Sequence, residues 1–302
     1  MTGLHRFAIL LAVCTLLLVV AGGLVTSNDA GLSVPDWPLS YGKLMPPMEG
    51  GILYEHGHRV IATLTGFLTV VMAIWLWRVD NRTWMKRLGL VAVVAVIAQG
   101  VLGGLTVIYL LPPAISVSHA CLAQLFFSTT VAIAVFTSAS WRRGPRVAMD
   151  SGTPRLRTLA IAAPILVLMQ LALGAAARHK AIGVVYHIGA SPLVTGVILW
   201  VCVRLMQRFS GHPAGHPALF RSALALLTIA FAQVFLGIAA YMSRIATVDA
   251  VQPMPIMIVF TVLHVAVGAL TMAASVVLAI QVFRNVRPQA GELAAERMSV
   301  AS

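Results

Sequence analysis

Charged side chains are scarce in this chain of 302 residues. They make up 10% of the residues, and only nine of them are Asp or Glu. Ordinary soluble domains are about one quarter charged, whereas 59% of this chain is hydrophobic. The composition therefore excludes a water-soluble enzyme and a disordered or collagen-like chain. Cysteine is scarce too, and its three residues (Cys14, Cys121 and Cys202) stand far apart in apolar runs, which excludes a disulfide scaffold.

Long apolar stretches fill most of the chain. A helix needs about 20 residues to cross a hydrocarbon core about 30 Å thick. Eight stretches meet this requirement, so we predict an all-α membrane protein with eight transmembrane helices. The predicted spans are Phe7 to Thr26, His58 to Trp77, Leu88 to Leu111, Ile115 to Ser138, Thr158 to Arg178, Tyr186 to Met206, Ser222 to Met242 and Ile256 to Phe283. The first apolar run is too long for a typical signal peptide, so we predict that it is a retained helix.

The basic residues predict the orientation. With a cytoplasmic N-terminus, all Lys and Arg residues lie on the cytoplasmic side except Lys43, Arg59, Arg178, Lys180 and Arg244. The positive-inside rule then places both termini in the cytoplasm. The same rule accounts for the net charge of +12, because the excess basic residues lie in cytoplasmic segments. We therefore expect the protein to be embedded in a lipid bilayer and not to bind nucleic acid.

The longest cytoplasmic loop divides the chain into two halves. We predict an N-terminal four-helix half (residues 1–140), a linker (141–157), a C-terminal four-helix half (158–284) and a cytoplasmic tail (285–302). The pattern QxxLG supports a duplication, since it occurs at Gln99–Gly103, Gln170–Gly174 and Gln233–Gly237. The alternative is that these glycines only allow close helix packing. Duplication predicts two pseudo-symmetric bundles related by an axis along the membrane normal.

Four of the nine histidines fall in the outer half of the membrane. His58 begins the second predicted span, His119 lies just inside the fourth, His187 begins the sixth and His264 lies about two turns into the eighth. We expect the loop residues His179, His212 and His216, and His5 at the terminus, to be solvated. A single membrane histidine often only bonds a neighbouring helix, but two per half at similar depth favour paired ligation.

Imidazole pairs in an apolar bundle, without thiolates or a carboxylate cluster, suit heme iron better than zinc. We therefore predict two bis-histidine hemes. Gly100, Gly103 and Gly104 would let the flat ring approach the third span, although helix packing explains them equally well. The long outer loop, Ser27 to Tyr54, is predicted to be functional, to anchor at the interface, or both.

Only one of the predicted sites has a nearby acid. Glu55 precedes His58 by three residues, so a helix places both on one face. The corresponding segment around His187 has no acid. Glu55 could instead be a charge favoured by the helix dipole, and His56 is a rival ligand on another face. The difference indicates one reactive heme and one electron carrier.

These motifs resemble the heme A synthase family, the enzymes that convert heme O to heme A. The similar segments are Gly22 to Pro47, Glu55 to Arg59 (EHGHR, resembling ExxHR), Gln99 to Phe127 and, more weakly, Tyr186 to Ala190 and Leu263 to Leu270. The resemblance implies that Glu55, His58 and His119 form the catalytic site for heme O, while His187 and His264 bind heme b. It further implies oxidation of a methyl group to a formyl group through hydroxylated intermediates, with oxygen from water, in a bacterial inner membrane. An electron acceptor, heme O synthase and terminal oxidase assembly are the implied partners.

The chain departs from the family at two places. One subclass carries a cysteine pair in the outer loop, where this chain has Ser33 or Val34 and Ser40, so the loop must be held without a disulfide. The second half has a short loop between its first two spans and no Arg after His187. A diheme electron-transfer or heme-transport membrane protein is the alternative, and Glu55 is the feature that argues against it.

Overall fold

Eight long helices make up most of the computed structural model, which describes residues 2–209 and 215–288. They are α1 (Gly3–Ser27), α2 (Gly51–Val79), α3 (Thr83–Ile108), α4 (Pro113–Thr137), α6 (Leu156–Arg178), α7 (Val184–Phe209), α8 (Pro217–Ala246) and α9 (Pro255–Asn285). All eight are long and apolar enough to cross a membrane, which confirms the predicted fold class. The remaining elements are the short helix α5 (Ala139–Arg142) and the strands β1 (Ala148–Asp150) and β2 (Val286–Pro288).

The helix ends follow local chemistry. Pro113, Pro217 and Pro255 stand in the first turns of α4, α8 and α9, where proline gives up no helical hydrogen bond. The predicted third span ran three residues too far, because Leu110 and Leu111 take positive φ angles of 59° and 61° and turn the chain after Ile108. Helix α2 begins at Gly51, so His58 lies about two turns inside this helix and not at its start.

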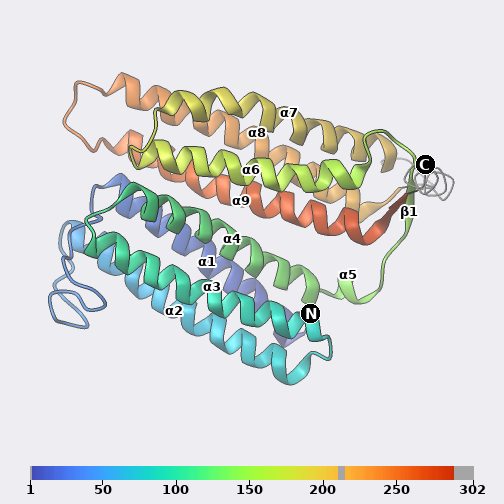
Figure 1. The fold of residues 1–302 in the computed structure, drawn as a ribbon, viewed down its shortest axis with the longest axis horizontal. Coiled ribbons are helices and arrows are strands. Elements are labelled where there is room, and N and C mark those ends of the chain that lie inside the picture. Colours follow the sequence, from blue (N-terminus) through green and yellow to red (C-terminus); the bar gives the residue numbers. More distant parts are fainter. Residues whose placement is uncertain (1, 210–214, 289–302) are drawn as a thin grey trace, which may run out of the picture.

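The helices form two groups of four that lie against each other (Figure 1). Helices α1–α4 contact one another around a ring, and so do α6–α9. The groups meet through α1, α4, α6 and α9. Figure 1 also shows that α1 begins and α9 ends at the same end of the bundle, here called the linker end because it carries residues 138–155. The opposite end, called the loop end, carries the outer loop of residues 28–50.

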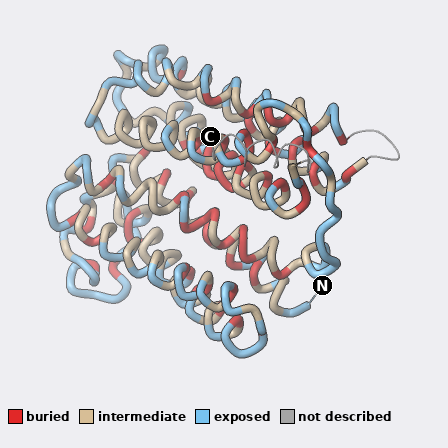
Figure 2. The backbone as a smooth tube through the Cα atoms, turned by 45° about the vertical axis from the view of Figure 1, so that its right-hand side comes forward, coloured by how far each residue is buried: buried red, intermediate tan, exposed pale blue. Residues whose placement is uncertain are grey.

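Apolar side chains cover the outside of the bundle as well as its inside. Figure 2 shows buried residues along the inner faces of the helices and exposed residues on the periphery and in the loops. Leu17, Phe67 and Ile97 expose more than half of their surface. Such helix faces are unfavourable in water and favourable against lipid, so the burial pattern supports a multi-pass membrane protein. The contact between the two groups is itself apolar and includes Val19, Phe127, Ala269 and Ala273.

The linker is more ordered than a plain loop. Strand β1 pairs in parallel with β2 and so fastens the linker to the end of α9. Asp150 accepts hydrogen bonds from the amides of Gly152 (3.1 Å) and Leu156 (2.7 Å), the latter at the start of α6. These contacts close the linker end of the C-terminal group.

One histidine expectation was wrong. His216 is 4% exposed and not solvated. Its Nε2 bonds the Arg146 carbonyl at 2.8 Å, and its Nδ1 accepts from the Leu219 amide at the start of α8. A capping role at a helix start explains the burial. His212 and the predicted tail from residue 289 onward lie outside the described residues.

Candidate functional site: paired histidines and the outer loop

Each of the four predicted ligands packs against a glycine on the preceding long helix. His58, His119, His187 and His264 all lie within about three turns of the loop-end start of their helices. A Cβ atom added at the facing glycine would lie only 2.9–3.3 Å from the Cε1 atom of the histidine ring. The pairs are Gly22 with His58, Gly103 with His119, Gly174 with His187, and Gly237 with His264. The same contact therefore occurs twice in each half of the chain.

The second shared feature is a backbone carbonyl one turn before each glycine. In the C-terminal half, His187 Nδ1 bonds the Gln170 carbonyl at 3.1 Å and His264 Nδ1 bonds the Gln233 carbonyl at 3.2 Å. A carbonyl can only accept, so each Nδ1 carries the proton and each Nε2 of the neutral ring is an acceptor, which in His264 faces the side-chain amide of Gln233 at 3.4 Å. This is the tautomer that binds a metal through Nε2.

In the N-terminal half the corresponding carbonyls also face the histidine rings. The carbonyls of Leu18 and Gln99 lie beside the rings of His58 and His119. The Nδ1 atoms of both rings are buried. His58 and His119 also lie close enough to interact electrostatically.

The C-terminal pair has the spacing that an iron atom requires. The ring centroids of His187 and His264 are 6.1 Å apart and their planes are nearly perpendicular, at 88°. A metal–imidazole nitrogen bond is about 2.0–2.1 Å long. Because the ring centre lies about 1.1 Å behind the nitrogen, two imidazoles on opposite sides of one metal ion have centres about 6 Å apart. These residues fit bis-histidine ligation of a heme iron.

Histidine pairs are the donor sets that these helices provide. Among residues 2–209 and 215–288, no three His, Cys, Asp or Glu side chains converge on a common metal position. Cys14, Cys121 and Cys202 are free thiols. The chemistry of the available donors therefore matches two imidazoles on a planar prosthetic group, which supplies the other ligands itself.

The repeated QxxLG pattern has a specific place in this arrangement. Its Gln supplies the carbonyl that faces the histidine, and its Gly supplies the space for the ring. The sequence shows the pattern in three helices. It does not reveal Leu18 and Gly22 of α1, because any residue has a backbone carbonyl and Leu18 takes the place of the Gln. Of the other glycines noted in α3, Gly104 faces the Trp37 ring of the outer loop, and a Cβ at Gly100 would meet nothing within 4 Å.

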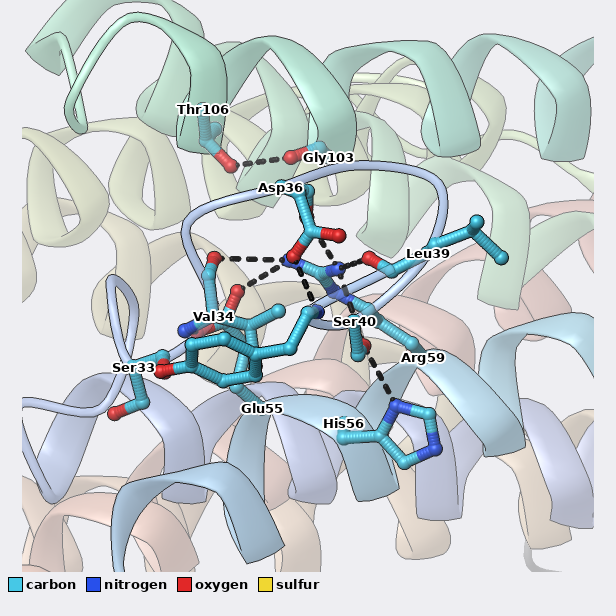
Figure 3. Close-up of polar contacts among 11 residues, drawn as sticks. Ser33, Val34, Asp36, Leu39, Ser40, Glu55, His56, Arg59, Gly103 and Thr106 are labelled. Atoms are coloured by element: carbon cyan, nitrogen blue, oxygen red, sulfur yellow. Dashed lines mark hydrogen bonds and ion pairs between the residues drawn. The ribbon is translucent and has the colours of Figure 1, made fainter. Parts of the chain in front are cut away.

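Arg59 holds the outer loop over the start of α2 (Figure 3). Its Nη1 donates to the carbonyls of Asp36 and Leu39, both at 2.7 Å. Its Nη2 pairs with Glu55 Oε1 at 2.6 Å. Asp36 in turn accepts from the amides of Tyr41 and Gly42, which lower the pKa of this carboxyl below its ordinary value of 3.8 by stabilising its charge. We call these residues, with those of the next paragraph, the loop network.

Glu55 and His56 both belong to the loop network. Glu55 is 4% exposed, and its Oε2 accepts from the Val34 amide at 2.8 Å. His56 is 5% exposed, and its Nδ1 bonds Ser40 Oγ at 2.8 Å. The resemblance places a cysteine pair of one subclass near Ser33 or Val34 and Ser40, and in this chain the Val34 amide and the Ser40 hydroxyl bond Glu55 and His56. His56 therefore serves the loop, while Glu55 stands one turn before His58 in α2.

Replacing Arg59 with glutamine is expected to loosen the outer loop. The variant loses the ion pair with buried Glu55 and the charged hydrogen bonds to the loop carbonyls, which are worth about 1.5–3 kcal/mol each. In detergent, we expect trypsin to cleave after Lys43 at least about tenfold faster than in the unaltered protein, as measured by mass analysis of the fragments. Arg78→Gln, at the other end of α2, is the control. Equal cleavage rates in the two variants would contradict a role of Arg59 in holding the loop.

Arg178 connects the two halves at the loop end. This residue ends α6, and its Nη2 donates to the Gly23 carbonyl (3.1 Å) and to Ser27 Oγ (2.6 Å), both in α1. The charge of Arg178 also acts on His264. The guanidinium thus lies between the N-terminal group and the C-terminal histidine pair.

Eight apolar helices with a histidine pair in each group of four define a multi-pass helical membrane protein whose core can hold metal-centred planar groups. Residues 5–191 match the cytochrome oxidase assembly protein family, so the chain belongs to this family. Helices α8 and α9, with His264, lie beyond the matched residues.

Individual relatives are all similar over part of the chain. The Heme A synthase of Symbiobacterium thermophilum is 33% identical over 187 residues, which cover 60% of this chain and 58% of the relative. The Heme A synthase of Shouchella clausii is 32% identical over 134 residues, covering 43% of this chain and 44% of the relative. That of Halalkalibacterium halodurans is 29% identical over 138 residues, covering 43% and 44%. The chain therefore matches about half the length of these relatives.

Proposed function

We propose that this protein is a heme A synthase, an oxidoreductase that converts a methyl group of heme O to a formyl group through hydroxylated intermediates. The observation that carries the proposal is the repeated histidine pair, of which only the N-terminal one has a buried carboxylate, Glu55, one turn away. The names of the relatives point to the same reaction. The product would supply heme A to terminal oxidases.

The two histidine pairs take different roles in this proposal. His187 and His264 bind heme b, whose iron supplies one-electron chemistry when bound. His58 and His119 hold the substrate, heme O. Two axial histidines leave no open position for oxygen at an iron, so the added oxygen comes from water. The methyl carbon would first lose electrons and a proton, water would then add to it, and repeating this oxidation would release four electrons to an external one-electron acceptor and four protons in all.

Glu55 is the residue proposed to act on the water. Its two oxygens accept one hydrogen bond each from Arg59 and Val34, and a carboxylate has about four acceptor positions. The remaining positions can orient a water molecule or take its proton. The same negative charge can stabilise positive charge that develops at the methyl carbon. Arg59 fixes the direction of the carboxylate for either task.

The proposed setting is a bacterial inner membrane with both termini in the cytoplasm. The loop end and all four histidines then face the extracytoplasmic side, and the linker end with its arginines faces the cytoplasm, as the positive-inside rule favours. Residues 1–140 would form the substrate half and residues 158–284 the heme b half, as pseudo-symmetric bundles. Heme O synthase and the terminal oxidase assembly apparatus are the proposed partners.

The function can be tested in a host that also makes heme O. The protein is expressed with a heme O synthase and purified in detergent, and its hemes are extracted and separated by chromatography with mass detection. We expect heme b together with heme A or its hydroxylated precursor. Heme b with unchanged heme O would contradict the proposal and favour a diheme electron-transfer or heme-transport protein.

A further inference from the structure

A heme held by His187 and His264 would bring the carboxylates of its two propionate groups into the C-terminal group of helices. His187 lies near the loop-end start of α7, and His264 lies in the third turn of α9. A carboxylate is costly in hydrocarbon, so these carboxylates would point toward the loop end, where the helices meet water. A partly buried carboxylate is stable when it is paired with a cation. The loop end should therefore provide a cation for this site.

Arg178 is the basic residue that meets this requirement. Helix α7 does not provide the cation, because His187 is followed by Ile188. The basic residues of the loop end are Lys43, Arg59, Arg178, Lys180 and Arg244. Both lysines and Arg244 are exposed, and Arg59 is paired with Glu55. Arg178 is only partly exposed and forms no ion pair with a carboxylate of residues 2–209 or 215–288.

The position of Arg178 in α6 directs it toward the C-terminal pair. Arg178 follows Gly174 by four residues, so both lie on one face of the helix, with Arg178 one turn nearer the loop end. Gly174 packs against the His187 ring, and the charge of Arg178 acts on His264. The other glycines that face a histidine have no cation at the same spacing, where the chain has Thr26, Val107 and Tyr241. The cation is thus particular to this site.

Helix α1 fixes the guanidinium through a single nitrogen. Arg178 Nη2 donates to the Gly23 carbonyl at 3.1 Å and to Ser27 Oγ at 2.6 Å. A guanidinium has five N–H donors in a planar fork, so Nη1 and Nε remain for a carboxylate. The charge of Asp29 also acts on Arg178, but Asp29 is exposed, so water and salt screen this attraction.

We propose that Arg178 binds a propionate carboxylate of the heme held by His187 and His264 and thereby raises the reduction potential of this heme. The free edge of the guanidinium, Nη1 and Nε, donates to the two carboxylate oxygens. Its positive charge favours ferrous over ferric iron, because the ferric form carries one more positive charge. Heme b then takes up electrons more readily than it would without Arg178. This inference rests on the proposed heme b site.

The test variant is Arg178→Gln, and the matched control is Arg244→Gln, which changes an exposed arginine at the loop end of α8. The midpoint potential of heme b is measured by spectroelectrochemical titration of the purified protein. Heme loss is measured by transfer to excess heme-free globin. In Arg178→Gln we expect a lower midpoint potential and about 10–100-fold faster transfer, because charged hydrogen bonds are lost. Arg244→Gln should match the unaltered protein. An unchanged midpoint potential in Arg178→Gln would overturn the inference.

Two further variants separate carboxylate binding from the connection to α1. Ser27→Ala removes one partner of Nη2 but keeps the guanidinium, and Arg178→Lys keeps the positive charge. We expect both variants to have midpoint potentials well above that of Arg178→Gln. If Ser27→Ala lowers the potential as much as Arg178→Gln does, Arg178 acts only by joining the two groups of helices, and the inference is overturned.

Infrared spectra provide a direct readout of the carboxylate. Reduced-minus-oxidised spectra are recorded with the heme propionates labelled with carbon-13. The labelled bands should shift in Arg178→Gln and in Arg178→Lys, which lacks the planar fork, but not in Arg244→Gln. The lysine variant therefore tests the inference even if Arg178→Gln loses its heme. Identical bands in all variants would overturn the inference. A His264→Ala protein that still carries heme b would instead contradict the proposed function, so the two failures are distinguishable.

Discussion

Replacing His264 with alanine is expected to remove heme b while heme O remains bound. The variant would lose one of the two imidazoles proposed to hold heme b, whose ring centroids are 6.1 Å apart. His187 would then be the only remaining protein ligand for the heme, so the heme b content should fall to about a tenth or less of normal. His187→Ala should give the same result. Reduced-minus-oxidised spectra and extracted heme content provide the measurement.

The control for this prediction is His5→Ala. His5 lies at the linker end, where its Nδ1 bonds Thr137 Oγ1 at 3.2 Å, far along the bundle from either pair. This variant should keep both hemes. A normal heme b spectrum in His264→Ala would show that the C-terminal pair is not the ligand set, whatever the enzyme activity.

Replacing Glu55 with glutamine is expected to abolish heme A formation while both hemes remain bound. The amide keeps the size of the side chain and one acceptor oxygen, but it loses the negative charge and the ability to take a proton. General-base catalysis contributes about 10²–10⁴-fold to a rate, so the rate of product formation should fall by at least about 100-fold. Chromatography of extracted hemes over time gives the rate.

A slow rate in Glu55→Gln could also arise from a loosened outer loop, because Glu55 pairs with Arg59. The two effects are therefore measured separately. Tryptic cleavage after Lys43 reports loop opening in the same preparation. Glu49→Gln, which changes an exposed acid in the outer loop, is the matched control. Slow product formation with normal cleavage assigns the loss to chemistry. A normal rate of heme A formation would contradict the catalytic role of Glu55.

The fold could be predicted from sequence because the bilayer imposes a simple length rule. Eight apolar runs long enough to cross hydrocarbon are local features, and each of them forms a helix. The errors lie where local pattern and tertiary contact disagree. Leu110 and Leu111 are apolar but turn the chain, and His216 in a Pro- and Gly-containing segment is buried because it bonds Arg146, which is distant in sequence.

The site could be predicted in part. Two histidines per half at similar depth are visible in the sequence, and the structure brings His187 and His264 to within 6.1 Å of each other. The proximity of Glu55 to His58 also follows from helical spacing. The contacts of Glu55 with Val34 and Arg59 could not be predicted, because the path of a 23-residue loop (residues 28–50) has no periodic signal.

The sequence by itself determined the number of spans, the membrane class of the protein and the identity of the four candidate ligands, because hydrophobic length and imidazole chemistry are properties of single residues and short runs. Only the tertiary structure decided which carbonyl and which glycine lie against each histidine ring. A backbone carbonyl is present at every residue, so its use by a side chain leaves no mark in the sequence. It depends on the distance and angle between two packed helices.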